Sequence, residues 1–245
     1  MTPQPARPIL PAAIVRLAIL EMSMNRIVFT VLLCAVLVPV SASADFGVGL
    51  SVGGFTGDRL YSASSQNPRI WENPTGDVSG TGNELLVDME SWLQFGLTGF
   101  TTLRDRWGLR FDLSFTDVDV DGKVRDQTGA SETVQWDQLF IFDMVAQATW
   151  RLGNGEDTYP WLGLGPALTV ASGEGDTLDQ TMPGLAWGAG WRISALEGAW
   201  FELGVRGILQ WPDWADEEAR LNADSFEGES TIHSLSASVS AGVVF

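Results

Sequence analysis

The sequence predicts an all-β protein, an eight-stranded antiparallel up-and-down barrel that crosses a membrane. Three observations predict it: large apolar residues alternate with other residues in eight segments, the second face of these segments is mostly Gly, Ser, Thr and Ala, and long and short connections alternate along the chain. Successive side chains of a strand point to opposite sides, so period-two alternation marks strands. A soluble sandwich or lipocalin-like barrel also alternates, but small uncharged residues suit a narrow interior and leave the bulky face to lipid.

The alternation itself gives the expected strands. It is clearest over residues 107–116, where Trp107, Phe111 and Phe115 share one face and Arg110 and Asp112 the other. The eight segments are 45–54, 90–101, 107–116, 134–152, 159–171, 184–194, 199–211 and 232–245.

The connections differ in length and charge. Short turns are expected near 103–105, 153–158 and 195–198, and long loops at 55–88, 117–133, 172–183 and 212–231, the last with a helical turn over 214–221. The long loops hold 20 acidic and 5 basic residues, so most of the net charge of −17 lies on one rim. This acidity argues against nucleic acid as a partner. Long extracellular loops that alternate with short periplasmic turns are typical of outer-membrane barrels.

Tryptophan outnumbers tyrosine 11 to 2, and its positions predict two girdles at the bilayer interfaces. One set lies near the short turns: Trp107, Trp150, Trp161, Trp191 and Trp200. The other lies near the long loops: Trp92, Trp136, Trp187 and Trp211. Trp161 and Trp200 have the inward parity and fit this pattern imperfectly.

Residues 1–44 are interpreted as a leader and signal peptide that is cleaved before Asp45. Arg26 gives a positive start, residues 27–40 are apolar, and residues 41–44 read Ser-Ala-Ser-Ala, a small-residue cleavage site. Met24 alone begins a complete signal, so it is the expected functional start. The predicted barrel domain is residues 45–245.

An exported chain of this size, with eight alternating segments and the C-terminal strand SLSASVSAGVVF, resembles the small outer-membrane barrels of the OmpA transmembrane-domain, OmpX, OmpW and opacity-protein type. The resemblance implies a cell outer-membrane location in a Gram-negative bacterium. It also implies that Val239, Val243 and Phe245 form the assembly signal read by the barrel insertion machinery. Outer-membrane lipid and lipopolysaccharide are then the expected partners, and we expect a monomer.

Charged residues of inward parity are expected to fill the lumen, because an eight-stranded barrel is just wide enough for side chains. The expected network comprises Arg110, Asp112, Asp143, Arg151, Arg192, Glu202 and Arg206. Pairing across the lumen would plug it. A narrow channel for ions or small solutes is the alternative.

Residues 117–122 read Asp-Val-Asp-Val-Asp-Gly, the first half of a calcium loop. Asp117, Asp119 and Asp121 are therefore candidate ligands for weakly bound Ca²⁺, the one cofactor considered. Thr128 occupies the position where such a loop has a bidentate Glu. A strand that continues out of the membrane, with Gly122 starting the loop, would have the same sequence pattern.

The expected role is structural or surface-interactive, with no catalytic residues. Some small outer-membrane barrels of the resembled type are enzymes. In this sequence, however, His233 falls on the opposite strand face from Ser234 and Ser236, so a Ser–His pair is not expected. A lipid-modifying enzyme and a soluble periplasmic barrel that binds a ligand inside are further alternatives. The acidic loops could gather divalent cations that bridge to lipopolysaccharide, or dock a partner.

Overall fold

The computed structural model describes residues 46–77, 79–104, 106–153, 155, 157–173, 178–196 and 198–245. These belong to one compact unit, Ala44–Phe245. The predicted leader and signal peptide, residues 1–44, lies outside the described residues. Within the described part of the chain, no helix is both long and apolar enough to cross a bilayer.

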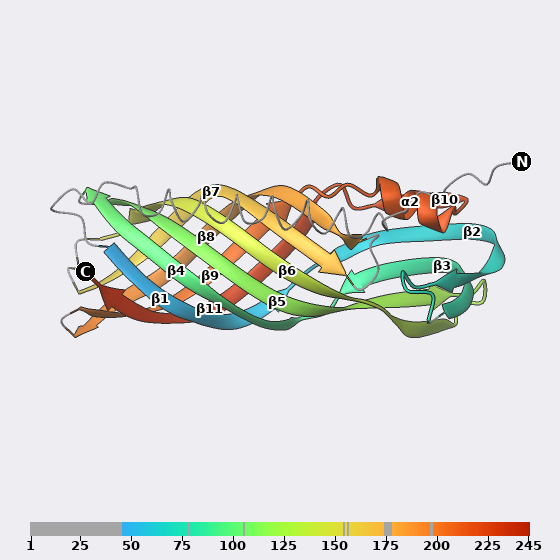
Figure 1. Ribbon diagram of the computed structural model, residues 1–245, viewed down its shortest axis with the longest axis horizontal. Helices are drawn as coiled ribbons and strands as arrows, with labels where there is room; N and C mark the ends of the chain where they lie inside the picture. Colours follow the sequence, from blue (N-terminus) through green and yellow to red (C-terminus); the bar gives the residue numbers. More distant parts are fainter. Residues whose placement is uncertain are drawn as a thin grey trace, which may run out of the picture. The chain divides into compact units, whose positions relative to one another are not determined.

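Eight strands close into a ring of antiparallel hydrogen-bonded pairs (Figure 1). They are β1 (Phe46–Thr56), β4 (Trp92–Arg104), β5 (Trp107–Arg125), β6 (Ser131–Arg151), β7 (Thr158–Gly173), β8 (Gln180–Leu196), β9 (Ala199–Gln210) and β11 (Ile232–Val244). Each strand pairs with the next in this order, and β11 pairs with β1. All eight predicted segments are present, which confirms the fold class.

The two faces of the ring match the predicted parity. Large apolar side chains point outward and are exposed, as with Leu50, Phe115 and Leu203, whereas inward residues of the same strands are buried. Water does not stabilise a continuous apolar exterior of this kind, but hydrocarbon does. The barrel therefore spans a membrane.

Tryptophans lie at both edges of this apolar exterior. The exposed ones are Trp107, Trp150 and Trp191 at the end with the short turns, and Trp92, Trp187 and Trp211 at the other end. The interpretation of three others as girdle residues was wrong. Trp161 and Trp200 are buried inside the barrel, as their parity indicates, and Trp136 is 0% exposed in a core beyond the apolar belt.

The long connections contain regular structure that the sequence interpretation assigned to loops. The first contains β2 (Arg59–Glu72) and β3 (Ser79–Met89), and the last contains α2 (Ala215–Leu221), close to the expected helical turn, and β10 (Ser225–Gly228). These elements lie at the opposite end of the barrel from the C terminus (Figure 1). The β10, β2 and β3 strands pair in that order, and β3 joins the far end of β5. We call β2, β3, β10, α2 and residues 117–125 and 131–137 the extension.

The second predicted loop, 117–133, is mostly strand. β5 continues to Arg125 and pairs with β6 up to Ser131, so the turn is confined to residues 126–130. Asp126 closes this turn by accepting hydrogen bonds from the backbone of Thr128 and Ala130 at 2.8 and 3.0 Å, and Gly129 adopts a φ of +85°.

The polarity of the two faces inverts along β5. Asp112, Ser114 and Thr116 are inward and buried inside the membrane-spanning part, and the same face continues as the buried Val118 and Val120. On the outward face, the apolar Phe115 is followed by the carboxylates of Asp117 and Asp119. This inversion follows the solvent, because lipid surrounds the barrel and water surrounds the extension.

An apolar core fills the extension and continues to the adjoining end of the barrel, where it includes Ile141 and Met182. Leu85, Val87 and Val124 pack with Tyr61, Trp71 and Trp136, and Leu221 of α2 covers them. Burial of several aromatic and aliphatic side chains, at about 1.5–3 kcal/mol each, stabilises these strands without lipid.

Candidate functional site: the barrel lumen

Glu202 is buried in the lumen and is shared by two arginines. Arg192 donates to its Oε2 from Nε and Nη2 at 2.9 and 2.6 Å, and Arg110 donates to Oε1 from Nη1. Arg110 also donates to Asp112 from Nε and Nη2 at 2.7 and 2.9 Å. Thr98 donates to the Asp112 Oδ1 at 2.7 Å. All four charged side chains are buried, so each depends on these partners for its solvation.

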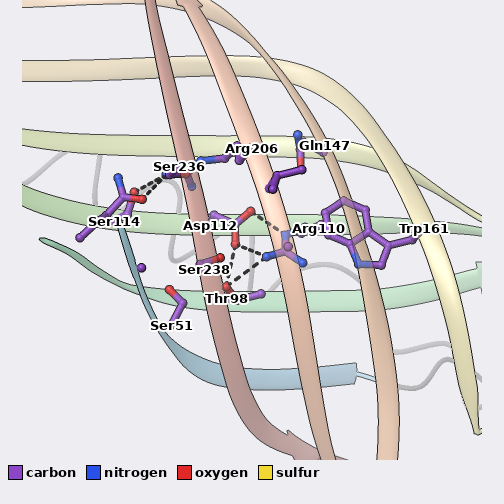
Figure 2. A pocket seen from close by; sticks show the side chains of 14 residues that line it. Ser51, Thr98, Arg110, Asp112, Ser114, Gln147, Trp161, Arg206, Ser236 and Ser238 are labelled. Carbon is purple, nitrogen blue, oxygen red and sulfur yellow. Dashed lines mark hydrogen bonds and ion pairs between the residues drawn. The ribbon is translucent and has the colours of Figure 1, made fainter. Parts of the chain in front are cut away.

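A second ion pair crosses the lumen nearer the extension. The Arg206 Nη2 lies 3.7 Å from Asp143 Oδ2. It also donates a hydrogen bond to Ser114 Oγ at 2.7 Å, and Figure 2 shows these two side chains. Asp143 also accepts a hydrogen bond from Thr169 Oγ1 at 2.6 Å. Arg206 is on β9 and Asp143 on β6, so this pair joins strands that are not neighbours in the ring.

Aromatic rings fill the space around the guanidinium groups. Arg110 lies 4.5 Å from the ring centroid of Trp161, and Arg192 lies 3.3 Å from that of Phe100. Arg151 lies 4.1 Å from the ring centroid of Tyr159. Figure 2 shows Trp161 beside Arg110 with Gln147 close by. Cation–π contacts of this kind stabilise a desolvated arginine.

Inward glycines make room for Trp161. A Cβ atom at Gly190 would lie 2.7 Å from the Trp161 Nε1 and from the backbone oxygen of Leu203. The small residues of the inner face thus accommodate an internal aromatic ring.

We predict that Gly190→Ala destabilises the barrel by about 1–3 kcal/mol, because the added methyl overpacks the lumen. Gly54→Ala is the matched control, since its Cβ would meet nothing within 4 Å. Urea unfolding of the two variants in lipid vesicles measures the difference. Equal unfolding midpoints would contradict the packing argument.

Two small voids remain in the lumen. One of about 20 Å³ lies among Arg110, Gln147, Trp161 and Arg206 (Figure 2), and one of about 30 Å³ lies nearer the short turns. A water molecule needs roughly 10–15 Å³ in this measure, so the first void holds one or two and the second two or three. Both amide atoms of Gln147 are buried without a protein partner at the first void, which makes it a polar site for water.

The structure brings six of the seven predicted lumen charges into ion pairs: Arg110, Asp112, Asp143, Arg192, Glu202 and Arg206. Arg192 pairs with Glu202 on the neighbouring strand, whereas Arg206 pairs with Asp143 across the lumen. Arg151 stacks on Tyr159. Sequence parity did not point to Trp161 as a partner of Arg110.

The candidate calcium ligands lie on the outward face of a continuous strand. Asp117, Asp119 and Asp121 alternate along β5, and Gly122 is paired with Val134 within that strand, so it does not start the loop. Asp121 raises the pKa of Glu90 through a hydrogen bond and like-charge repulsion. In the described part of the chain, no group of three or more His, Cys, Asp or Glu side chains is arranged to hold a metal ion. Calcium binding stays a prediction.

The sole histidine is separated from the neighbouring serines. His233 is exposed on the outer face of β11, and Ser234 and Ser236 are buried on the inner face. Opposite faces of one strand cannot form a Ser–His pair.

The C-terminal strand completes the ring. Val239, Val243 and Phe245 are exposed toward lipid, and the backbone N–H of Phe245 donates to Phe46 O at 2.8 Å. Their role as an assembly signal stays a prediction.

The fold is similar to that of solved outer-membrane proteins. The outer membrane protein OprG from Pseudomonas aeruginosa is 15% identical with a TM-score of 0.53, and the match covers 82% of this chain and 96% of that chain. Neisserial surface protein A, NspA, is 14% identical with a TM-score of 0.46, covering 83% and 99%. Ail, the attachment invasion locus protein of Yersinia pestis, is 14% identical with a TM-score of 0.36, covering 81% and 98%. No family model and no curated protein matches the sequence. The likeness to OprG shows that the fold is that of a small outer-membrane β-barrel.

Proposed function

We propose that this chain is a monomeric protein of the cell outer membrane, with a closed lumen and a structural or surface-interaction role carried by the extension. The observation that supports this best is the filling of the lumen by Glu202, its two arginines and the Arg206–Asp143 pair. A solute would have to break several buried ion pairs to pass. We infer an orientation with the short turns in the periplasm and the extension outside the cell, because long outer loops over short periplasmic turns are usual in outer-membrane barrels.

The extension supports the surface role. Its interior is an apolar core, and its outer face carries acidic residues such as Asp117 and Glu227. An acidic rigid surface attracts divalent cations, which can bridge it to the phosphates of lipopolysaccharide. The exterior belt of the barrel contacts lipid. The insertion machinery is the proposed partner during assembly.

Cell fractionation tests the location. We expect the protein to stay with outer membranes after carbonate washing, and external protease to cleave only in the extension and in the loops at that end of the barrel. Release by carbonate would support a soluble periplasmic barrel instead and would overturn the proposal.

Single-channel recording tests the closed lumen. We expect no steady conductance steps from the purified barrel in planar bilayers, because the ion pairs leave only water-sized voids. The polar lining favours a narrow ion path as the second candidate function. Steady steps that Arg206→Gln alters and Glu227→Gln leaves unchanged would establish that path and exclude the plug.

A further inference from the structure

Among the described residues, the inward charges of the lumen leave one cation without an ion-pair partner. Arg110, Arg192 and Arg206 are matched by Asp112, Glu202 and Asp143 in the ion pairs described above. Arg151 is a fourth inward arginine, and none of the ion pairs among the described residues includes it. Its Nε is buried without an acceptor. Arg151 is half-buried at the end of β6, and a buried N–H group of an unpaired cation is costly unless an anion or ordered water solvates it.

The void of about 30 Å³ lies beside this arginine. Arg106, Arg151 and Arg192 line it together with Tyr159 and Thr149, and no carboxylate is among the described residues that line it. Tyr159 accepts a hydrogen bond from Arg192 at 3.2 Å, so its own proton is available to another acceptor. The lining of the void is therefore positive and rich in donors.

Trp161 also lines this void. Its Nε1 is buried without an acceptor, although the ring is 5% exposed. Arg192 is itself buried and held by Glu202 and by the Phe100 ring, so the positive charge at the void is fixed in place. Fixed, desolvated donors around a cavity bind anions without a large ordering cost.

We propose that this void is a binding site for a small monatomic anion, a halide such as chloride, held by Arg151, Arg192 and Tyr159. A void of about 30 Å³, which is room for two or three water molecules in the same measure, admits one ion of this size with little space beside it. Arg106 lines the void and is exposed, so the ion enters from the end with the short turns. The bound anion neutralises the fourth arginine, and the site is independent of any role of the extension.

Halide-dependent unfolding tests the site. The full barrel is unfolded by urea in lipid vesicles at constant ionic strength, with sodium gluconate replaced stepwise by sodium chloride or bromide. Binding to the folded state alone is expected to multiply the folding equilibrium constant by up to about tenfold for each tenfold rise in halide above Kd. Arg151→Gln is expected to abolish this dependence, and Arg151→Lys to retain part of it. Arg125→Gln, at the far end of β5, is the matched control and should behave like the unaltered chain.

Bromide anomalous diffraction provides a readout that needs no variant. A peak between Arg151 and Arg192 supports the site, and it decides the question if Arg151→Gln fails to fold. The proposal is overturned if bromide appears only at surface arginines, if chloride and gluconate give equal midpoints, or if Arg151→Gln keeps the full halide dependence. Those results would mean that water alone fills the void. Inorganic phosphate in place of chloride should give no added stability, and an equal effect of phosphate would contradict the monatomic assignment.

Discussion

Replacing Glu202 by Gln is expected to destabilise the barrel by about 3–5 kcal/mol, the largest effect of any single lumen substitution. Glu202 is 1% exposed and accepts hydrogen bonds from both Arg110 and Arg192. Gln is nearly the same size but carries no charge, and its amide N–H groups face guanidinium donors. The variant therefore leaves two cations buried with a single carboxylate, that of Asp112, between them.

Urea unfolding in lipid vesicles, followed by tryptophan fluorescence, measures this loss. Glu227→Gln is the matched control because Glu227 is exposed in the extension, and its expected effect is within about 0.5 kcal/mol. If Glu202→Gln and Glu227→Gln unfold at the same urea concentration, the shared carboxylate does not stabilise the lumen. The double variant Glu202→Gln with Arg192→Met should recover part of the loss, since it removes one of the two uncompensated charges.

The membrane-spanning strands could be predicted because one face of each strand contacts lipid and the other lines the lumen. The two kinds of residue therefore alternate along the sequence with period two. Lipid requires bulky apolar residues such as Leu203 on one face, and the narrow lumen requires small or paired residues such as Gly190 on the other. A barrel in a bilayer meets both requirements in all eight segments, because it turns one face of every strand to lipid and the other to the lumen. Strand ends were less predictable, because β5 continues with the same period while its polarity inverts.

The extension was read as loops for that physical reason. Asp117 and Asp121 looked like a solvated rim, although Val118 and Val120 between them are the core of a strand. The strands β2 and β3 lie within the first expected long loop. Their pairing shifts register between Ser64 and Arg69, and this shift interrupts the alternation that would have predicted them.

Lumen residues could be predicted by parity, but their partners could not. Parity places Arg206 and Asp143 inside the barrel, yet which strands face each other depends on how far the strands are staggered around the ring. The same limit applies to Trp161, which lies against Arg110 although β5 and β7 are not paired.

The extension contains a buried polar network that should make it sensitive to alkali. Tyr61 donates to Glu217 of α2 and accepts a hydrogen bond from Trp136 Nε1 at 2.6 Å, and Arg220 donates to Glu217 at 2.6 and 2.9 Å. Burial of the phenol, followed by the nearby Glu217 carboxylate, raises the pKa of Tyr61 well above 10.0. The network therefore requires Tyr61 in its protonated form.

We predict that the extension loses stability above about pH 10 while the barrel stays folded. A group whose pKa is higher in the folded than in the unfolded state stabilises the fold fully below its unfolded pKa, about 10 for tyrosine, and this contribution falls as pH rises toward the folded pKa. Proteinase K cleavage within residues 212–231, mapped by mass spectrometry and corrected for protease activity at each pH, measures the opening. Cleavage should increase from pH 9 to 11.

Tyr61→Phe separates this titration from other alkaline effects. The variant should open more readily at neutral pH, by about 1–3 kcal/mol, because the Trp136 N–H and the Glu217 carboxylate lose a partner. Its opening should then change little between pH 9 and 11. Tyr159→Phe, in the lumen, should keep the alkaline response, and so should Lys123→Arg, which preserves the exposed charge paired with Asp88 at 3.4 Å. An alkaline response that persists in Tyr61→Phe, or disappears in Lys123→Arg, would assign the sensitivity to another group, because the predicted opening depends on the Tyr61 phenol proton donated to Glu217.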